Sequence, residues 1–314
     1  MMKNYTWQNA TRQQQAYAKI NTYLEVLGRR PDGYHELCSH IQLLTLCDTL
    51  QVTTEARPGE ALSVTLRCDQ PQLSCGEDNL IVRAVRAFCA ALALPKEQEG
   101  VHIVIELQKQ IPMQGGLGGG SADAAATLMA LNALCGEPMD TAALCAVGIT
   151  LGADVPMCIC GHKGAQTARG IGELLTPAPG LSKDVSLLVV LPGTAVSTPA
   201  AFRLLDERYT PAQIKEREQA LPQHYDAHLQ ALAAGEVGAL ANTSFNRFEE
   251  AVFALQPQTK QVYELMQGLR ADAVRMSGSG PTLVGYFTDV AAAESAQSFL
   301  QERGFVAHLC HPLV

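Results

Sequence analysis

The sequence predicts a two-domain α+β protein, and three observations support this prediction. The 314 residues are about twice the length of a typical domain. Hydrophobic residues make up 47% and charged residues 17% of the chain, an ordinary composition for a folded globular protein. Strand-like segments come first, and helical segments alternate with strands later. We expect an N-terminal domain over residues 1–170, starting with a loose arm at 1–15, and a C-terminal domain over residues 171–314.

The N-terminal half contains a predicted hairpin, further strands and two helices. Tyr17 to Leu27 alternate like a strand, and the turn-forming sequence RRPDG follows. Apolar spacing predicts a helix over 79–92. A second helix, SADAAATLMALNAL, should begin with Gly120 or Ser121 as its N-cap and end near Gly136. Further strands are expected at 50–54, 63–66 and 101–107.

The Gly- and Pro-rich stretch at 161–180 is expected to separate the two domains. Beyond it, the pattern alternates between helices and strands. Helices are predicted at about 199–218, 224–236 and 257–270. Strands are predicted near residues 186, 273 and 282.

Charge and hydropathy argue against two classes of partner. The 23 Lys and Arg against 31 Asp and Glu give a net charge of −8, the opposite of the basic surface expected for general binding to nucleic acid or anionic membranes. No window approaches the roughly 18 uninterrupted apolar residues of a membrane-spanning helix. We therefore expect no nucleic-acid or membrane partner, and an anionic substrate must be bound by a local site. The sequence makes no prediction of oligomeric state.

The cysteine pattern predicts reduced thiols and a cytoplasmic location. The ten cysteines are scattered without a C-x-x-C pair, and a chain of this length needs no disulfide framework. The N-terminal residues lack the apolar core of a signal peptide and do not resemble a transit peptide. The eight histidines show no H-E-x-x-H spacing, so no zinc site is predicted.

The most informative segment is PMQGGLGGGSADAAA, at 112–126. Its five glycines let the backbone approach a bulky anion and lead into a helix whose free N–H groups point at that anion. A flexible turn before an Ala-rich helix is the alternative. A Walker A loop would need Lys-Ser or Lys-Thr after the last glycine, and a dinucleotide fingerprint would need glycine where Ser121 stands. The segment therefore predicts a phosphate-binding loop of another kind.

This loop resembles the nucleotide loop of the GHMP kinases, a superfamily that includes galactokinase, homoserine kinase and mevalonate kinase. Four further segments carry the resemblance, in the family's order, from about Ala16 almost to the C-terminus. They are AKINTYLEVLGRRPDGYHEL at 18–37, EDNLIVRA at 77–84, LGADVPMCICG at 151–161 and RMSGSGPT at 275–282. The resemblance implies the two-domain α+β GHMP fold with the active site in the interdomain cleft, and ATP and Mg²⁺ as cofactors.

Within the superfamily the chain resembles the branch that acts in the methylerythritol phosphate route to isoprenoids. The implied reaction is ATP-dependent phosphorylation of the 2-hydroxyl of 4-diphosphocytidyl-2-C-methyl-D-erythritol, a small molecule with a cytidine diphosphate group, giving the 2-phosphate and ADP. One alternative is a GHMP kinase for another alcohol, such as homoserine or a mevalonate derivative, against which the segments AKIN and DGYH argue. Another is a non-catalytic GHMP-fold regulator, against which the presence of Lys19 and Asp154 argues.

Two charged residues are the candidate catalytic pair. Asp154 is an isolated carboxylate among apolar residues, which by itself indicates either a helix cap or a site residue. The resemblance makes it the general base for the substrate hydroxyl, and a weak base suffices because phosphoryl transfer depends mainly on positioning and charge stabilisation. Lys19 lies in an apolar strand, where the alternative is an exposed strand position. The resemblance places it beside Asp154, where it would stabilise the aspartate charge and the transferring phosphoryl group.

The resemblance also assigns binding residues. Asn21, Tyr34, His35 and Thr198 would bind substrate, with Tyr34 and His35 holding the cytosine by stacking and hydrogen bonding. The alternatives are a surface histidine for His35 and a helix start for Thr198. The loop residues assigned to ATP are Pro112, Met113, Gln114, Gly115, Gly116, Leu117, Gly118, Gly119, Gly120, Ser121 and Ala122.

Three smaller features complete the predicted site. Asn79 and Lys109 would border the adenine nucleotide, with a helix cap and a solvated charge as their respective alternatives. The SGSGP sequence at 277–281 is either a bare turn or the family's third motif, which closes over the loop and substrate. The loop departs from its commonest form at Gln114 and Ala122, and the Mg²⁺ ligands stay open, with Ser121 as a candidate.

Overall fold

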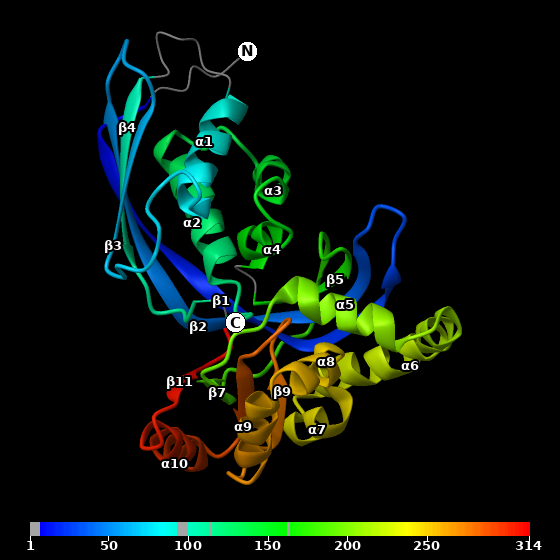
Figure 1. The fold of residues 1–314 in the computed structure, drawn as a ribbon. Helices are drawn as coiled ribbons and strands as arrows, with labels where there is room; N and C mark the ends of the chain where they lie inside the picture. Colours follow the sequence, from blue (N-terminus) through cyan, green and yellow to red (C-terminus); the bar gives the residue numbers. More distant parts are fainter. Residues whose placement is uncertain (1–6, 93–99, 114, 162–163) are drawn as a thin grey trace. The chain divides into compact units, whose positions relative to one another are not determined.

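The computed structural model describes residues 7–92, 100–113, 115–161 and 164–314 (Figure 1). The chain forms two compact units, each built from three segments. Unit 1 contains Met1–Ala18, Cys47–Ile111 and Gly118–His162, and unit 2 contains Lys19–Leu46, Pro112–Leu117 and Lys163–Val314. Both units combine helices with a sheet, which confirms the α+β class. The division into domains 1–170 and 171–314 stays a prediction.

Unit 1 is a sheet covered by helices. The strands β1 (Ala10–Arg29) and β2 (His35–Ala56) contribute their residues up to Ala18 and from Cys47. In this unit β2 pairs antiparallel with β4 (Val101–Gln108), and β4 pairs parallel with β3 (Ser63–Cys68). The alternating burial along β4 directs its isoleucines toward the helices. These are α1 (Leu80–Leu92), α2 (Gly119–Leu134), α3 (Thr141–Ile149) and α4 (Val155–Cys160).

Helix α2 forms the centre of unit 1. It is rich in alanine and buried almost all round, so α1 and α4 pack directly against it. Its N-cap is Gly118, with a φ of 70°, and not Gly120 or Ser121 as predicted. The helix begins earlier than predicted because Gly118 adopts the left-handed conformation that Gly permits, which leaves Gly119 and Gly120 helical.

The beginning of the described chain is ordered against unit 1. Residues 10–15, predicted as part of a loose arm, form the first part of β1. The Asn9 side chain accepts a hydrogen bond from the backbone N–H of Ala56 at 2.8 Å, and the Trp7 ring lies 6.3 Å from that of Phe88. The expectation of a loose arm is therefore wrong for residues 7–15, and residues 1–6 lie outside the described part.

Unit 2 contains two groups of strands. The remaining parts of β1 and β2 form the predicted hairpin around the turn at Gly33, and β8 (Phe245–Asn246) pairs parallel with β1. The stretch 161–180, predicted as a boundary, contains β5 (Ala165–Gly170), which pairs with β2, and β6 (Leu174–Pro177). A separate antiparallel sheet has the order β11-β7-β10-β9. Its strands are β7 (Ser186–Leu191), β9 (Ala273–Met276), β10 (Leu283–Phe287) and β11 (Val306–Cys310).

The helices of unit 2 differ from the prediction in two places, because the chain breaks at residues 209–210 and the gap predicted between 218 and 224 is helical. The predicted helix 199–218 is two helices, because Thr210 caps the second one in a capping box with Gln213 and Pro211 occupies its first turn. The helices are α5 (Thr198–Arg208), α6 (Pro211–Ala234), α7 (Leu240–Thr243), α8 (Phe248–Leu255), α9 (Pro257–Gln267) and α10 (Val290–Gln301). The buried side chains of α8, α9 and α10 pack on β7 and β10 to form the core.

Two chain-wide predictions can be compared with the described residues. All ten cysteines fall in the described part and are free thiols. No helix of this part is long and apolar enough to cross a membrane.

Candidate active site

The glycine loop begins in unit 2, where it lies against the 277–282 turn. Gly116 has a φ of 77°, and a Cβ at this position would lie 2.5 Å from the carbonyl oxygen of Ser277. A Cβ on Gly115 would lie 2.5 Å from Thr282 Oγ1. Only glycine allows these close approaches. The SGSGP sequence is therefore more than a bare turn, since it forms the surface on which the loop rests; Gln114 lies outside the described residues.

The loop continues in unit 1 as the start of α2. The N–H groups of the first turn, which includes Gly119, Gly120 and Ser121, have no acceptor within a helix. They lie at the positive end of the helix dipole, which favours a phosphate group. The free N–H groups at this end are compatible with the predicted phosphate-binding loop, and phosphate binding itself stays a prediction.

Lys19 is buried in unit 2, with 6% of its surface exposed, so the alternative of an exposed strand position is wrong. Its ammonium donates to Asn21 Oδ1 at 2.8 Å, and its backbone N–H donates to Leu117 O in the loop at 2.9 Å. The Asn21 amide donates to Ser39 Oγ at 2.7 Å, and Ser39 donates to the carbonyl of Tyr23 at 2.8 Å. Two predicted site residues are thus brought together, and Ser39, which the sequence analysis missed, orients them.

Asp154 stands at the N-terminus of α4 in unit 1. It occupies the N-cap position, but its side chain makes no capping hydrogen bond. The carboxylate is half-buried. The preceding turn lies beside the start of α2, because a Cβ on Gly152 would be 3.9 Å from Ser121 Oγ. Asp154 thus occupies a cap position without a capping bond from its side chain, and its role as a site residue stays a prediction.

Tyr34 and His35 differ sharply in exposure. Tyr34 follows the hairpin turn and is 61% exposed. The His35 ring is stacked on Phe202 with a centroid distance of 4.4 Å, and its Nε2 donates to Asp206 at 2.7 Å. Both partners lie on α5 and were missed by the sequence analysis, because nothing local links them to residue 35. His35 is thus held in one orientation by partners of its own, which agrees with a satisfied histidine and leaves substrate binding as a prediction.

Thr198 is the first residue of α5, as its helix-start alternative predicted. Its hydroxyl also contacts Ser279 Oγ at 2.6 Å, which connects α5 to the 277–281 turn. Asn79 acts as a helix cap, since its Oδ1 accepts the N–H of Ile81 at 2.8 Å. That bond agrees with the cap alternative and leaves a nucleotide contact as a prediction.

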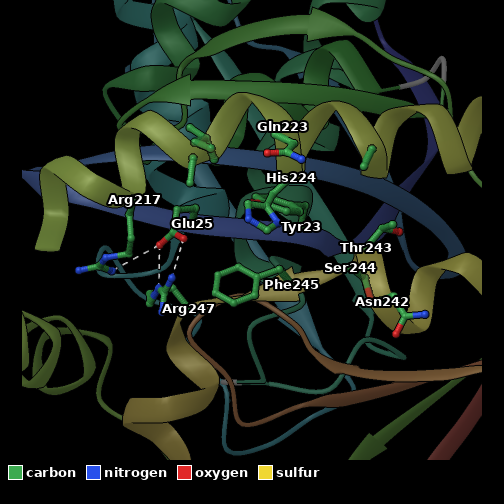
Figure 2. A pocket seen from close by; sticks show the side chains of 13 residues that line it. Tyr23, Glu25, Arg217, Gln223, His224, Asn242, Thr243, Ser244, Phe245 and Arg247 are labelled. Atoms are coloured by element: carbon green, nitrogen blue, oxygen red, sulfur yellow. Dashed lines mark hydrogen bonds and ion pairs between the residues drawn. The ribbon is translucent and has the colours of Figure 1, made fainter.

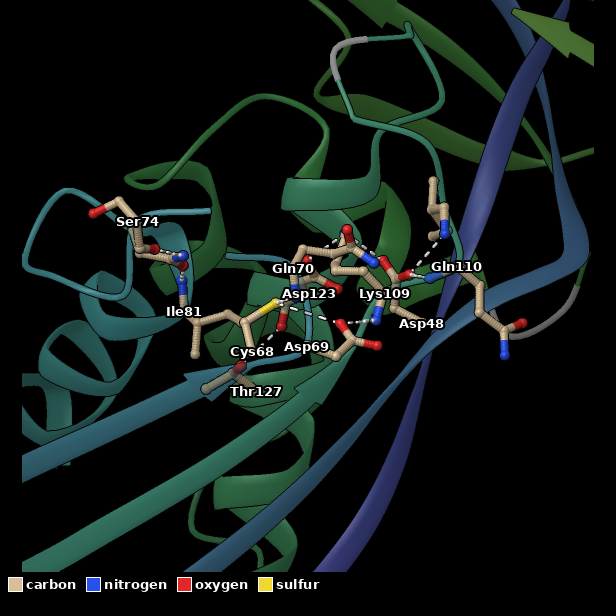
Figure 3. A network of polar contacts seen from close by, with 12 residues as sticks. Asp48, Cys68, Asp69, Gln70, Ser74, Ile81, Lys109, Gln110, Asp123 and Thr127 are labelled. Atoms are coloured by element: carbon tan, nitrogen blue, oxygen red, sulfur yellow. Dashed lines mark hydrogen bonds and ion pairs between the residues drawn. The ribbon is translucent and has the colours of Figure 1, made fainter. Parts of the chain in front are cut away.

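Lys109 is not a solvated charge. Its ammonium donates to Asp48 and, at 2.9 Å, to Asp123, and the exposed fraction of its side chain is 5% (Figure 3). This alternative is therefore wrong. The two aspartate partners were missed, because they lie 61 and 14 residues away in the chain.

Models of two known domains match the chain. The model described as GHMP kinases N terminal domain matches residues 79–162, and that described as GHMP kinases C terminal matches residues 229–305. A 4-diphosphocytidyl-2-C-methyl-D-erythritol kinase from Desulfitobacterium hafniense is 37% identical over 303 residues, covering 95% of this chain and 94% of the relative. One from Gloeobacter violaceus is 37% identical, with 94% and 92% covered. The chain belongs to the GHMP kinases.

Solved structures agree with this membership. A crystal structure of 4-(cytidine 5′-diphospho)-2C-methyl-D-erythritol kinase is 34% identical, with a TM-score of 0.73, and covers 96% of this chain and 99% of that one. Mevalonate kinase from L. major shares the fold with a TM-score of 0.75 at 13% identity, covering 99% of each chain. As a GHMP kinase the protein is a small-molecule kinase with ATP as phosphate donor.

The sequence analysis left the Mg²⁺ ligands of this GHMP kinase open, with Ser121 as a candidate. Within the described ranges, no three His, Cys, Asp or Glu side chains gather as a metal site. The Ser121 hydroxyl at the start of α2 is the side-chain oxygen closest in sequence to the free N–H groups. Mg²⁺ commonly keeps waters and binds substrate phosphates with one or two protein ligands, so Ser121 fits such a role.

A cavity of about 370 Å³ in unit 2 involves other residues (Figure 2). Tyr23 and Phe245 line its apolar wall, and Glu25 pairs there with Arg217 at 3.7 Å and with Arg247 at 2.7 Å. The predicted substrate residues are not among those that line it. The cavity is therefore not the predicted cytidine site.

Proposed function

We propose that this GHMP kinase transfers the γ-phosphoryl group of ATP to the 2-hydroxyl of 4-diphosphocytidyl-2-C-methyl-D-erythritol, in the methylerythritol phosphate route to isoprenoids. The observation that carries the proposal is a likeness over more than 90% of both chains to two kinases named for this substrate. The mevalonate and homoserine kinases among the solved structures are only 12 to 18% identical, which supports the fold alone.

The proposed chemistry uses the half-buried carboxylate and the buried lysine. Asp154 takes the proton of the hydroxyl, the hydroxyl oxygen bonds to the γ-phosphorus, and the bond from that phosphorus to the β-phosphate oxygen breaks to release ADP. Lys19, held by Asn21, supplies positive charge for the transferring group. Mg²⁺, with Ser121 as a ligand, would neutralise charge on the phosphates.

Several observed contacts support the proposed nucleotide and cytidine sites. The loop from Pro112 to Ala122 offers glycine backbone and free helix N–H groups to the ATP phosphates. Exposed Tyr34 is free to stack on cytosine, and His35, held by Phe202 and Asp206, offers a fixed hydrogen-bonding edge. Thr198 presents a hydroxyl beside Ser279 for the diphosphocytidyl part of the substrate.

The test is ADP release by the purified protein with ATP, Mg²⁺ and a panel of alcohols. The panel contains diphosphocytidyl-methylerythritol, mevalonate, phosphomevalonate, homoserine and galactose. Turnover confined to the first compound is expected. Turnover with another alcohol would overturn the proposed substrate, and silence across the panel with ATP binding intact would favour a regulator.

Asp154→Asn tests the base. We expect turnover to fall by at least about a hundredfold, since general-base catalysis contributes about that much or more, while ATP still binds. Asp184→Asn is the matched control, because Asp184 is an exposed aspartate of unit 2 whose carboxylate accepts a hydrogen bond from nearby Ser182 at 3.3 Å. Near-normal turnover in Asp154→Asn would remove Asp154 from the mechanism without affecting the substrate assignment.

A further inference from the structure

Three buried charges of unit 1 surround the point where the glycine loop leaves and rejoins this unit (Figure 3). Lys109 precedes the loop, Asp123 lies in α2 just after it, and Asp48 lies on β2. The exposed fraction of each side chain is 5% or less, and the ammonium donates to both carboxylates. Buried ion pairs contribute little net stability, so their presence here calls for another role, such as fixing geometry.

Carboxylates hold the backbone that enters the loop. Asp48 Oδ1 accepts the N–H of Gln110 at 2.6 Å and that of Ile111 at 2.8 Å. Asp69 Oδ1 accepts the N–H of Lys109 at 3.0 Å. All three residues before Pro112 therefore have their backbone N–H groups fixed by an aspartate, and hydrogen bonds to a charged acceptor are stronger than neutral ones.

Asp123 links the start of α2, which follows the loop, to the segment that enters the loop. Its Oδ2 accepts from the Lys109 ammonium at 2.9 Å, which connects α2 to the entering segment. The two ends also touch, because a Cβ on Gly119 would lie 3.1 Å from Ile111 Cγ2 and 3.4 Å from Lys109 Nζ. The charges thus hold the first turn of α2 and the entering backbone in one arrangement.

The charge balance of the cluster makes it sensitive to the loss of any member. The pKa of Asp123 is raised to about 7, because burial and the neighbouring Asp48 raise it by more than the Lys109 charge lowers it. Burial lowers the pKa of Lys109, but the two carboxylates more than offset this effect, so its pKa is raised and it stays charged. Two carboxylates share one ammonium, and removal of that ammonium would leave both buried without a cation.

We propose that Asp48, Lys109 and Asp123 are positioning residues that set both ends of the glycine loop in the nucleotide-binding arrangement before nucleotide binds. The inference rests on the proposed ATP-binding role of the loop. The Lys109 ammonium acts on the loop through its ion pairs with Asp48 and Asp123. A preformed loop avoids the free-energy cost of ordering during binding, so the cluster raises ATP affinity and leaves the acceptor site unaffected.

The test compares single and combined variants by calorimetric titration with adenylyl imidodiphosphate, a non-hydrolysable ATP analogue. We expect Lys109→Met, Asp48→Asn and Asp123→Asn each to weaken affinity by about tenfold, in the range of coupling found between contacting residues. The triple variant should regain stability, because no buried charge is left unpaired, but its affinity should stay low, because the ion pairs that hold the loop ends are absent. Lys260→Met is the control, since Lys260 is an exposed lysine paired at 3.7 Å with Glu264.

Two results would overturn the positioning role. If Lys109 contacted the nucleotide and the aspartates had no part in binding, Lys109→Met would bind weakly and both aspartate variants would bind normally. If the cluster served stability alone, melting temperatures would fall while affinity stayed within about twofold. The expected result in turnover assays is that the single variants raise the KM for ATP and leave the KM for the acceptor unchanged. Failure of the wild type to bind the analogue would contradict the proposed function instead.

A measurement on the wild type tests the proposal even where a variant does not fold. Hydrogen exchange at the N–H groups of residues 109–111 should already be slow without nucleotide and change little when the analogue is added. Fast exchange that becomes slow on binding would show that the nucleotide orders the loop, and the preformed arrangement would be refuted.

Discussion

Lowering the pH from 8 to 5 should destabilise unit 2 through His40 and His228. Both rings are completely buried, and both contact Thr22 Oγ1, at 2.6 Å from His40 Nδ1 and 2.8 Å from His228 Nε2. His40 Nε2 donates to the carbonyl of Pro179 at 2.8 Å, so its Nδ1 accepts from Thr22. Thr22 then accepts from His228 Nε2, and His228 Nδ1 carries no proton and has no partner among the described residues. The network therefore requires both histidines to be neutral.

The magnitude follows from the pKa values. Burial lowers the pKa of His40 to about 4 and, with help from the nearby His40 and Arg275, that of His228 to about 3. The unfolded histidines keep a pKa near 6.5. Below that pH the unfolded state binds more protons, so stability present above pH 6.5 is lost as the pH falls toward 4 and 3. Between pH 8 and pH 5, each histidine therefore lowers the free energy of unfolding by about 2 kcal/mol.

The contribution of Asp123 to the pH dependence of stability is opposite in sign to that of the two histidines. The assay must therefore separate the two contributions. Its folded pKa of about 7 lies above that of an unfolded aspartate, so it adds stability as the pH falls below 7. The urea dependence of unfolding should therefore be compared between the wild type and His228→Gln at each pH. Asp123 contributes equally to both proteins, and the variant should lose about 2 kcal/mol less between pH 8 and 5. Equal losses would refute a neutral, buried His228.

Two substitutions test the loop and the cytidine site. Gly116→Ala should weaken ATP binding and cost about 1 to 3 kcal/mol or more, because of strain at a φ of 77° and a Cβ 2.5 Å from Ser277 O. Gly59→Ala, with a φ of 83° but open space around it, should show the strain cost in thermal melts and normal ATP binding. His35→Ala should raise the KM for the cytidyl substrate at least about tenfold more than the KM for ATP, as for a lost hydrogen bond to a substrate. Equal effects on both KM values would argue against cytosine recognition by His35.

The regular elements could be predicted where their signal is local. Tyr17–Leu27 alternates and lies within β1, and the apolar spacing of 79–92 gives α1. The break between α5 and α6 was missed although Thr210 and Pro211 carry a local capping signal. The short helix α8, the terminal helix α10 and β11 were not predicted. Such elements are stabilised by tertiary packing more than by intrinsic propensity, so their sequence patterns are weak.

The residues of the candidate site could likewise be predicted only where their signal is local in the sequence. The glycine loop was predictable because backbone conformation depends on the glycines themselves. The role of Lys109 was not, because a buried charge must have partners but its own sequence does not identify them. Asp48 did carry a signal, as a carboxylate within the apolar strand LLTLCDTLQV, and this pattern predicts a buried partner of unknown position. Only the pairing of β2 with β4, which sets Thr49 opposite Gln108, brings that carboxylate to Lys109. Positioning residues of a site are therefore predictable as buried charges, and their partners only once the register of the strands is known.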